Sequence, residues 1–519
     1  MAAIAQTEAV GVGQLRLKFP GEQTFVFRDL SLTVPAGQKV LLLGPSGCGK
    51  STLLQVLGGL IPDSIEVPLV YDSIRVPDSC GFVFQDPDTQ FCMPYVDEEL
   101  AFVLENLSVP REQMRARMTE ALAQVGLALD DLHTPVKRLS QGMKQRLALA
   151  SALLLDPDVL FLDEPTALLD PEGTRQVWES VSKIADGKTI LIVEHKIDRI
   201  AELADRVVLL NDEGAIIADG EPNVVFRTCR GQLQEYGIWH PGVWENYSAS
   251  PSYRRLTDQH RVPEAAQRPV IVLRDWKGFR GNEGRIAVEE AEIYPGDWIA
   301  VVGDNGAGKS TLLLSLMQLL RTEGKYELNG RDLSASGSQG SRNRQRPMAD
   351  DVGFVFQNPE FQFVTNTVYD EIAYSLRRDG AKSAARIEAA VAQMLALFDL
   401  DVGPGRHPYQ LSTGQKRRLS VATAVVCGQR VLLLDEPTFG QDARNTFAIL
   451  ETLEQLRQQG TAIVTVTHDP QAVRHFATHV WQIADGKLVR RDPAERCPFI
   501  ASGRAEREEE KRYELARTR

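Results

Sequence analysis

The sequence contains no run of apolar residues that approaches the ~20 needed to cross a bilayer. Its first residues, MAAIAQTEAV, lack a basic segment followed by a long apolar one, so no signal peptide is expected. The six cysteines are scattered without a CxxC pair, which disfavours a disulfide framework or a zinc site and fits a reducing compartment. We therefore expect a soluble chain that reaches membranes only through partners.

The chain also lacks a net positive charge: 58 Lys and Arg are outnumbered by 70 Asp and Glu, for a formal net charge of −12. Nucleic-acid binding usually requires a basic surface, so we expect no nucleic-acid partner. A length of 519 residues with 43% hydrophobic and 25% charged residues is typical of a globular protein with two or three domains.

The most informative segment is VLLLGPSGCGKSTLL, from Val40 to Leu54. An apolar strand, a glycine-rich turn and a second apolar run that indicates a helix follow one another, in the pattern G-x-x-x-x-G-K-[ST]. Glycines allow backbone N–H groups to surround phosphate oxygens, and a helix N-terminus adds partial positive charge. Lys50 would reach the β- and γ-phosphates of a nucleotide, and the Ser51 hydroxyl would bind Mg²⁺.

The same pattern returns as IAVVGDNGAGKSTLL, from Ile299 to Leu313, with Lys309 and Ser310 in the same places. Later matching residues, such as Glu164 and Glu436, are slightly further apart in the chain than the two lysines are. A period this long indicates a duplicated domain. The second half is therefore longer than the first between these motifs. We assign its additional residues to the polar stretch at 331–347, which we interpret as a surface loop.

Short, continuous apolar strands follow in each half, at 158–165 and 189–195, and again at 430–437 and 462–468. Helical segments lie between the strands, an arrangement that predicts a parallel sheet buried on both faces. Each half also has a Ser and a Gly at the start of an apolar helix, in LSQGMKQRLALA (139–150) and LSTGQKRRLSVA (411–422). Backbone amides at such a helix start form a second surface that can face phosphate.

Together these segments resemble an ABC-type ATPase with two fused nucleotide-binding domains, and the resemblance covers nearly all of the chain. The phosphate loops match Walker A, LSQGM and LSTGQ match the signature usually written LSGGQ, and VLFLDEP and VLLLDEP match Walker B. The Q-loop and the D-loop also have matches in both halves, as does the switch histidine; the D-loop aspartates are Asp170 and Asp442. The resemblance implies an α/β fold of two P-loop domains, each with a mostly parallel sheet core, an antiparallel β portion and a helical subdomain.

The resemblance also implies a role for each matching residue. Glu164 and Glu436 would polarise the attacking water, and His195 and His468 would contact the γ-phosphate. Six residues would bind Mg²⁺: Ser51, Gln85, Asp163, Ser310, Gln357 and Asp435. The ATP-binding residues of the first phosphate loop would be Gly44, Pro45, Ser46, Gly47, Cys48, Gly49, Lys50, Ser51 and Thr52. Those of the second would be Gly303, Asp304, Asn305, Gly306, Ala307, Gly308, Lys309, Ser310 and Thr311.

The remaining ATP contacts would come from the Q-loop glutamines Gln85 and Gln357 and from the signature. Two domains closing head to tail would complete the Lys50 site with Ser412 and Gly414, and the Lys309 site with Ser140 and Gly142. Phe19 and Phe279 precede their lysines by nearly the same spacing and are candidates for stacking on the base, although either equally fits a core aromatic.

Three departures from the family pattern stand out. Gln141 and Thr413 replace the first glycine of the signature, and Met143 replaces its glutamine in the first half. Glu194 precedes the switch histidine where the second half has Thr467.

A narrower resemblance follows the Q-loop glutamines, in FVFQDPDTQFCMPYVDEELAF and FVFQNPEFQFVTNTVYDEIAY. These stretches, with a second glutamine at Gln90 and Gln362, are similar to the ATPases of energy-coupling-factor importers of cobalt and vitamins. That group implies an ATP-hydrolysing subunit on the cytoplasmic face of the cell membrane, peripheral to it. Its partners would be a transmembrane coupling subunit and a membrane-embedded substrate-binding subunit.

Two other functions fit the same motifs. One is a fused ATPase of a sugar or peptide importer, and the other is a soluble twin-ATPase that acts on ribosomes. The second usually has a long charged helical linker, whereas the middle of this chain is rich in Pro, Ser and Tyr. We predict a first ATPase domain at 1–240, a linker at 241–268, a second ATPase domain at 269–492 and a charged tail at 493–519.

Overall fold

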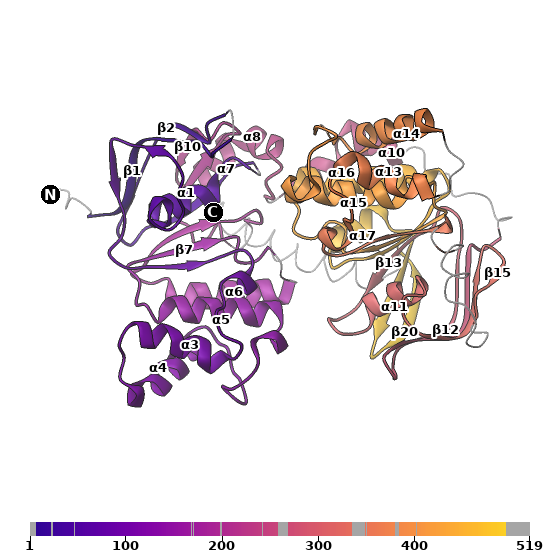
Figure 1. The fold of residues 1–519 in the computed structure, drawn as a ribbon, viewed down its shortest axis with the longest axis horizontal. Helices are drawn as coiled ribbons and strands as arrows, with labels where there is room; N and C mark the ends of the chain where they lie inside the picture. Colours follow the sequence, from indigo (N-terminus) through magenta and orange to yellow (C-terminus); the bar gives the residue numbers. More distant parts are fainter. Residues whose placement is uncertain are drawn as a thin grey trace, which may run out of the picture. The chain divides into compact units, whose positions relative to one another are not determined.

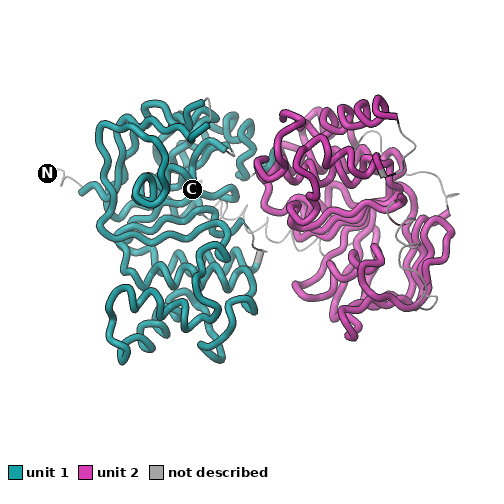
Figure 2. Tube along the Cα trace, in the orientation of Figure 1, with its two compact units in different colours: residues 1–243, 442–444 teal, residues 244–441, 445–519 magenta. Residues whose placement is uncertain are grey.

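The computed structural model describes residues 7–21, 24–45, 47–167, 169, 171–197, 200–240, 242–257, 268–334, 348, 350–378, 383–400 and 402–494. The chain divides into two compact units, which Figure 2 shows in different colours. Unit 1 comprises residues 1–243 and 442–444, and unit 2 comprises residues 244–441 and 445–519. The C-terminal tail predicted at 493–519 lies outside the described residues from residue 495 onward.

Unit 1 combines an antiparallel sheet with a mostly parallel one (Figure 1). Strands β1 and β2 pair in antiparallel fashion, and β4 and β5 join β1. The six-stranded sheet has the order β10-β9-β3-β8-β7-β6, in which only the edge strand β10 is antiparallel to its neighbour. The strands are β1 (Glu8–Leu17), β2 (Phe27–Pro35), β3 (Lys39–Leu43), β4 (Leu69–Val70), β5 (Ser73–Arg75), β6 (Cys80–Val83), β7 (Val159–Asp163), β8 (Thr189–Val193), β9 (Arg206–Leu210) and β10 (Ile216–Gly220).

The helices of unit 1 cover both faces of the parallel sheet, because alternate side chains of each strand point to opposite faces. On β7, Leu160 and Leu162 pack with the helices that follow the Q-loop, whereas Val159 and Phe161 pack with α1 and the antiparallel sheet. The helices are α1 (Lys50–Leu57), α2 (Leu60–Asp63), α3 (Val96–Asn106), α4 (Arg111–Gln124), α5 (Gln141–Leu153), α6 (Pro171–Ile184), α7 (Pro222–Thr228) and α8 (Arg230–Glu235).

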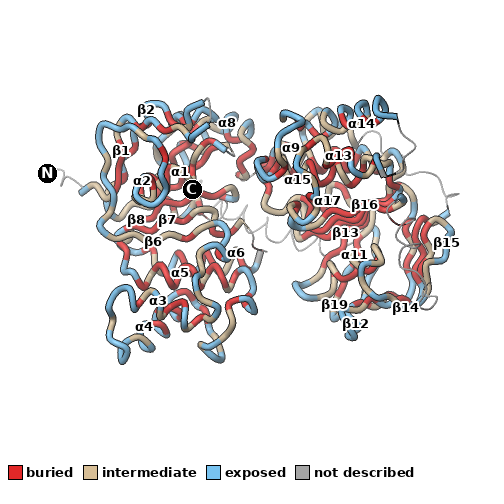
Figure 3. Tube along the Cα trace, in the orientation of Figure 1, coloured by how far each residue is buried: buried red, intermediate tan, exposed pale blue. Residues whose placement is uncertain are grey.

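Unit 2 repeats this plan within one continuous sheet, of the order β15-β14-β11-β12-β20-β19-β13-β18-β17-β16. Strands β13, β16, β17, β18 and β19 pair in parallel and form its buried core (Figure 3). The strands are β11 (Ile271–Arg280), β12 (Glu283–Ile293), β13 (Trp298–Val302), β14 (Thr322–Leu328), β15 (Arg331–Asp332), β16 (Val352–Val355), β17 (Val431–Asp435), β18 (Ala462–Val466), β19 (His479–Ala484) and β20 (Lys487–Pro493). The predicted surface loop at 331–347 therefore begins as an edge strand, and residues 335–347 lie outside the described residues.

The helices of unit 2 are α10 (Pro251–Thr257), α11 (Lys309–Leu316), α13 (Val368–Arg378), α14 (Ala384–Leu397), α15 (Thr413–Val425) and α17 (Pro470–Phe476), with most of α9 (Val243–Ser248) and α16 (Ala443–Gln458). The α/β fold class that the sequence predicts is thus confirmed, with a parallel core, an antiparallel portion and a helical part in each unit.

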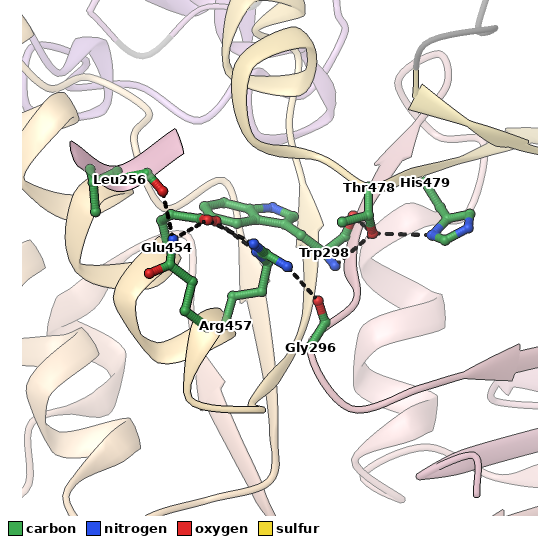
Figure 4. Close-up of polar contacts among 8 residues, drawn as sticks. Leu256, Gly296, Trp298, Glu454, Arg457, Thr478 and His479 are labelled. Atoms are coloured by element: carbon green, nitrogen blue, oxygen red, sulfur yellow. Dashed lines mark hydrogen bonds and ion pairs between the residues drawn. The ribbon is translucent and has the colours of Figure 1, made fainter. Parts of the chain in front are cut away.

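Two helices, α9 and α10, lie in the stretch that the sequence predicts as a linker. They pack on the rest of unit 2, and α9 does so through aromatic contacts. The rings of Tyr247 and Phe447 stack at 3.8 Å between centroids, and Trp244 stacks on His475 at 5.2 Å. There is a polar connection as well, because Nε2 of Gln458 on α16 donates to the Leu256 carbonyl at 2.8 Å. Leu256 is labelled in Figure 4. The predicted boundaries at 241 and 268 remain predictions.

None of the helices in the described part of the chain is long and apolar enough to span a bilayer.

Candidate functional site

The first phosphate loop joins β3 to α1 and has three glycines at positive φ, Gly44, Gly47 and Gly49. A Cβ at Gly49 would come within 2.5 Å of Val26, so only glycine fits there. The Lys50 side chain is only 6% exposed and folds back over the loop, where Nζ donates to the carbonyls of Gly44 and Pro45, each at 2.9 Å. The loop is therefore a preformed turn with its lysine held at the centre.

The second phosphate loop has the same construction between β13 and α11. Gly303, Gly306 and Gly308 have positive φ, and Nζ of Lys309 donates to the carbonyls of Gly303 and Asp304 at 2.6 and 2.9 Å. Each unit thus contains a phosphate loop of the same geometry.

Oxygen ligands suited to Mg²⁺ meet at the carboxyl end of the parallel strands. The Ser51 hydroxyl donates to Oδ1 of Asp163 at 2.8 Å, and Ser310 makes the equivalent hydrogen bond to Asp435. Burial raises the pKa of Asp163 to about 6 and also raises the pKa of Asp435. A buried carboxylate beside a hydroxyl is stabilised by a hard divalent cation, so these residues fit Mg²⁺.

Glu164 follows β7 with a positive φ of 47°, an unusual conformation for a residue other than glycine. Its Oε1 atom lies 2.9 Å from Nε2 of His195, and its Oε2 atom accepts a hydrogen bond from Nε2 of Gln85, also at 2.9 Å. Burial alone would raise the pKa of Glu164, but His195 and Lys50 together outweigh it and the pKa is lowered. Residues of two other predicted motifs, Gln85 and His195, therefore meet at the Glu164 carboxylate.

Glu436 has the same backbone conformation, with a φ of 50°, but in the described part of the chain its carboxyl group has one partner residue, His468, whose amide donates a hydrogen bond to it. Nε2 of His468 lies 3.6 Å from its Oε1 atom, and that oxygen is buried without a hydrogen bond among the described residues. Burial, with the charge of Asp435, raises the pKa of Glu436 to about 8. The two predicted catalytic pairs thus differ in the structure, although their motifs match.

The Q-loop backbone is held by a residue of the signature helix that the sequence analysis did not single out. In unit 1, Nε2 of Gln145 donates to the carbonyls of Phe84 and Gln85, each at 3.2 Å. In unit 2, Arg417 replaces it, and its guanidinium donates to Phe356 at 2.7 Å and to Gln357. Gln145 and Arg417 occupy matching positions of the internal repeat, which therefore offered a signal for them.

The signature serines begin the helices α5 and α15. Ser140 accepts a hydrogen bond from the Met143 amide at 3.2 Å. Ser412 forms a full capping box, because Oε1 of Gln415 also accepts from the Ser412 amide at 3.0 Å. The departure at Met143 therefore removes a helix-capping contact within its own unit. The glycines beside them, Gly142 and Gly414, are buried.

The two aromatic candidates lie in the antiparallel portions of the two units. Phe19 is in the turn between β1 and β2, which approaches Gly49 through Val26. Phe279 is near the end of β11 with Arg321 over its ring at 4.8 Å. Their role in stacking on a base stays a prediction.

The structure describes the other predicted residues of both loops (Cys48, Thr52, Asn305, Ala307 and Thr311), but Ser46 and Asp170 lie outside the described residues. Cys48 is buried, and burial raises the pKa of its thiol.

Comparison with known proteins agrees with this geometry. The sequence matches the ABC transporter family over residues 27–167 and 289–439. It is 35% identical to the "Putative HMP/thiamine import ATP-binding protein YkoD" of Bacillus subtilis, over 93% of this chain and 91% of that protein. It is 33% identical to a "Putative ABC transporter ATP-binding protein" of Methanosarcina acetivorans, over 92% of this chain and 85% of that protein.

A protein of the same name from Streptococcus pneumoniae is 33% identical over 91% of this chain and 88% of its own length. Among solved structures, the ATP-binding cassette MJ0796 bound to ADP and phosphate aligns with 43% of this chain and 98% of its own, at 24% identity and a TM-score of 0.40. ATP-binding subunits of ABC transporters hydrolyse ATP with Mg²⁺ and work with transmembrane partners. The chain belongs to the ABC transporter family, as an ATP-binding subunit with two fused ATPase domains.

Proposed function

We propose that this chain is the energy-coupling ATPase of a membrane importer for a vitamin, a vitamin precursor or a metal ion. The observation that carries the proposal is the similarity to a relative named for HMP/thiamine import, over 93% of this chain and 91% of that relative. The stretches after Gln85 and Gln357, which resemble energy-coupling-factor ATPases, point to the same class of importer.

Each ATP site would use one set of the predicted motif residues. Lys50 would bind the β- and γ-phosphates after leaving the loop carbonyls, and Ser51, Asp163 and Gln85 would hold Mg²⁺. Bound Mg²⁺ would neutralise phosphate charge during cleavage. Glu164 would orient the attacking water, and His195 would contact the γ-phosphate. In the second site the same roles would fall to Lys309, Ser310, Asp435, Gln357, Glu436 and His468.

We further propose that ATP closes the two domains head to tail, so that each signature completes the other unit's site. Separately expressed halves test this proposal. We expect ATP hydrolysis only after the halves are mixed, and full activity from a demonstrably monomeric half would overturn it.

Unit 2 has an exposed apolar cluster beside its Q-loop, suited to a membrane-protein partner. Phe361 is 76% exposed and Val364 67%, and Tyr409 donates a hydrogen bond to the Glu360 carbonyl next to them. Large exposed apolar clusters commonly mark protein–protein contacts. We therefore place the transmembrane coupling subunit, which carries the substrate-binding subunit, against Phe361, Val364 and Tyr409, with the chain peripheral to the cytoplasmic face of the cell membrane.

The test is purification of the tagged full chain in mild detergent, followed by identification of the membrane subunits that accompany it. We expect a coupling subunit and a small substrate-binding membrane protein, and cells should need Lys50 for uptake of labelled thiamine or HMP. Phe361→Asp should abolish the association, whereas Thr89→Asp, at the matching position of unit 1, should weaken it less. Recovery of ribosomes, or of sugar or peptide permeases, would overturn the proposal.

A further inference from the structure

A buried carboxylate in unit 1 has no part in the functions assigned so far. Glu194 lies between the end of β8 and the switch histidine His195, and it is only 3% exposed. A charged side chain in such a place is costly unless donors surround it. We propose that Glu194 is a positioning residue that ties the switch-histidine segment to the turn after Glu164, and so fixes the Glu164–His195 pair.

The contacts of Glu194 lie on both sides of that pair. Its Oε1 atom accepts hydrogen bonds from the Thr166 amide at 3.1 Å and from the Thr166 hydroxyl. Its Oε2 atom accepts from the His195 amide at 2.9 Å. Thr166 closely follows Glu164 in the chain, so one carboxylate connects the backbone that carries the predicted base to the backbone that carries the histidine.

The backbone of His195 is held at its carbonyl as well. That carbonyl accepts a hydrogen bond from the Trp239 amide at 3.2 Å, next to a parallel bridge between Lys196 and Trp239. Ile238, beside Trp239, is 1% exposed and belongs to the core of unit 1. The N–H and the C=O of His195 are thus both hydrogen-bonded, which holds the backbone that carries the imidazole ring.

Unit 2 has no carboxylate at the position that corresponds to Glu194. Thr467 occupies the place of Glu194, and its shorter side chain accepts from the Asp469 amide at 3.1 Å. A cavity of about 10 Å³ is lined by Thr438, Thr465 and Thr467 among others. Thr438 corresponds to Thr166 in the internal repeat. The cavity of unit 2 therefore lies where Glu194 is hydrogen-bonded to Thr166 in unit 1.

The catalytic pair of unit 2 is correspondingly looser. The hydroxyl of Thr465, which lines the cavity, is buried without a hydrogen bond among the described residues. The His468–Glu436 separation is 3.6 Å, against 2.9 Å for His195–Glu164. The histidine and the glutamate are therefore closer together in the unit that has Glu194, and further apart in the unit that has Thr467 in its place.

The inference rests on the proposed assignment of Glu164 and His195 to the first ATP site, and it does not depend on the imported molecule. Because the oxygens of Glu194 are taken by protein donors, its removal should slow cleavage and leave ATP binding nearly unchanged. A displacement of about 1 Å in a reacting group can cost up to ~10²-fold in rate.

The test uses the full-length Glu436→Gln chain saturated with ATP, in which only the first site can cleave. The steady-state cleavage rate at saturating ATP and the ATP concentration for half-maximal rate are measured with and without Glu194→Thr, which introduces the residue that the second half has at this position. We expect about a tenfold lower rate and less than a twofold change in the half-maximal ATP concentration.

Two further variants separate positioning from folding. Glu194→Gln keeps an oxygen for Thr166 but presents an amide N–H₂ to the His195 amide, so its rate should fall between those of the parent and Glu194→Thr. Thr166→Val should lower the rate about two- to threefold in the parent and have no further effect with Glu194→Thr. Thr438→Val, in unit 2, is the matched control and should leave the rate unchanged.

A Glu194→Thr rate within twofold of the parent, measured per nucleotide-binding chain, overturns the inference. So does additivity of Thr166→Val with Glu194→Thr, or a change confined to ATP affinity. Each of these results is independent of whether the chain co-purifies with an importer, which tests the proposed function separately.

Discussion

The Nε2 atom of His195 lies 2.9 Å from Oε1 of Glu164, whereas the matching atoms of His468 and Glu436 are 3.6 Å apart. The first carboxylate also accepts from Gln85, while Oε1 of Glu436 is buried without a hydrogen bond among the described residues. Both oxygens of the Glu164 carboxylate therefore have polar partners, whereas Oε1 of Glu436, in the same motif of the other unit, has no hydrogen bond among the described residues.

This difference predicts opposite effects of the same substitution on stability. Glu164→Gln removes a charge-assisted hydrogen bond and should lower the melting temperature of the nucleotide-free protein by about 3–8 °C. Glu436→Gln replaces a buried carboxyl group whose Oε1 has no hydrogen bond among the described residues and whose pKa is raised to about 8, so it should leave the melting temperature unchanged or raise it. Differential scanning calorimetry in a chelator at fixed pH measures both, and equal shifts would contradict the prediction.

The two substitutions should also differ in their effect on hydrolysis. Because the Glu164–His195 pair is the closer one, and the opposing signature LSTGQ keeps its glutamine Gln415, we expect the Lys50 site to be the stronger. Glu164→Gln should therefore reduce steady-state ATP hydrolysis about two- to tenfold more than Glu436→Gln. Equal losses in the two variants would show that the sites are equivalent.

A third prediction concerns the start of α5. Met143 has no side-chain oxygen that could accept from the Ser140 amide, whereas Oε1 of Gln415 accepts from the Ser412 amide at 3.0 Å. Met143→Gln should complete the capping box and raise the melting temperature of unit 1 by about 1–3 °C. The reciprocal Gln415→Met should lower the melting temperature of unit 2 by a similar amount, and no change in either variant would contradict the capping role.

A fourth prediction concerns the buried ion pair of α16 (Figure 4). Nε and Nη2 of Arg457 donate to the two oxygens of Glu454 at 2.7 and 2.8 Å, and Nη1 donates to the Gly296 carbonyl at 2.9 Å. Arg457→Ala leaves a buried carboxylate without its main partner and should destabilise unit 2 by about 3–5 kcal/mol.

Chemical denaturation monitored by the tryptophans measures that loss. Replacing the pair together, with Arg457→Met and Glu454→Leu, should recover most of it, because no charge is then buried on folding. Arg175→Ala, in an exposed ion pair of unit 1, is the matched control and should cost much less, because solvent screens the pair. An equal loss in the single and the double variant would contradict the prediction.

A fifth prediction concerns the thiol inside the first phosphate loop. Cys48 is 3% exposed, and burial raises the pKa of its thiol above the ordinary value of 9.0. Since the thiolate is the reactive form, Cys48 should resist iodoacetamide at pH 8 and become reactive only as the pH rises further or the protein unfolds. Peptide mass spectrometry should find the exposed Cys92 alkylated first, and the reverse order would contradict the prediction.

Much of the fold followed from local pattern. A strand, a glycine-rich turn and a helix are specified within the short segment from Val40 to Leu54, and the internal repeat transfers the same interpretation to Ile299–Leu313. The continuous apolar strands indicated a sheet buried on both faces, because no polar alternation was present. Local pattern did not show that residues 243–257 form helices, since their stability comes from rings such as Tyr247 on Phe447, which is distant in the chain.

The sequence motifs alone indicated two phosphate loops, because the same motifs occur twice in the same order. They also indicated which residue types would serve each ATP. How alike the two candidate sites are became visible only in three dimensions. Glu194 stood out in the sequence as a departure, but its partner Thr166 lies on the turn after a different strand, β7. Hydrogen bonds and burial of this kind depend on which strand ends the fold brings together, and no local pattern encodes that distance.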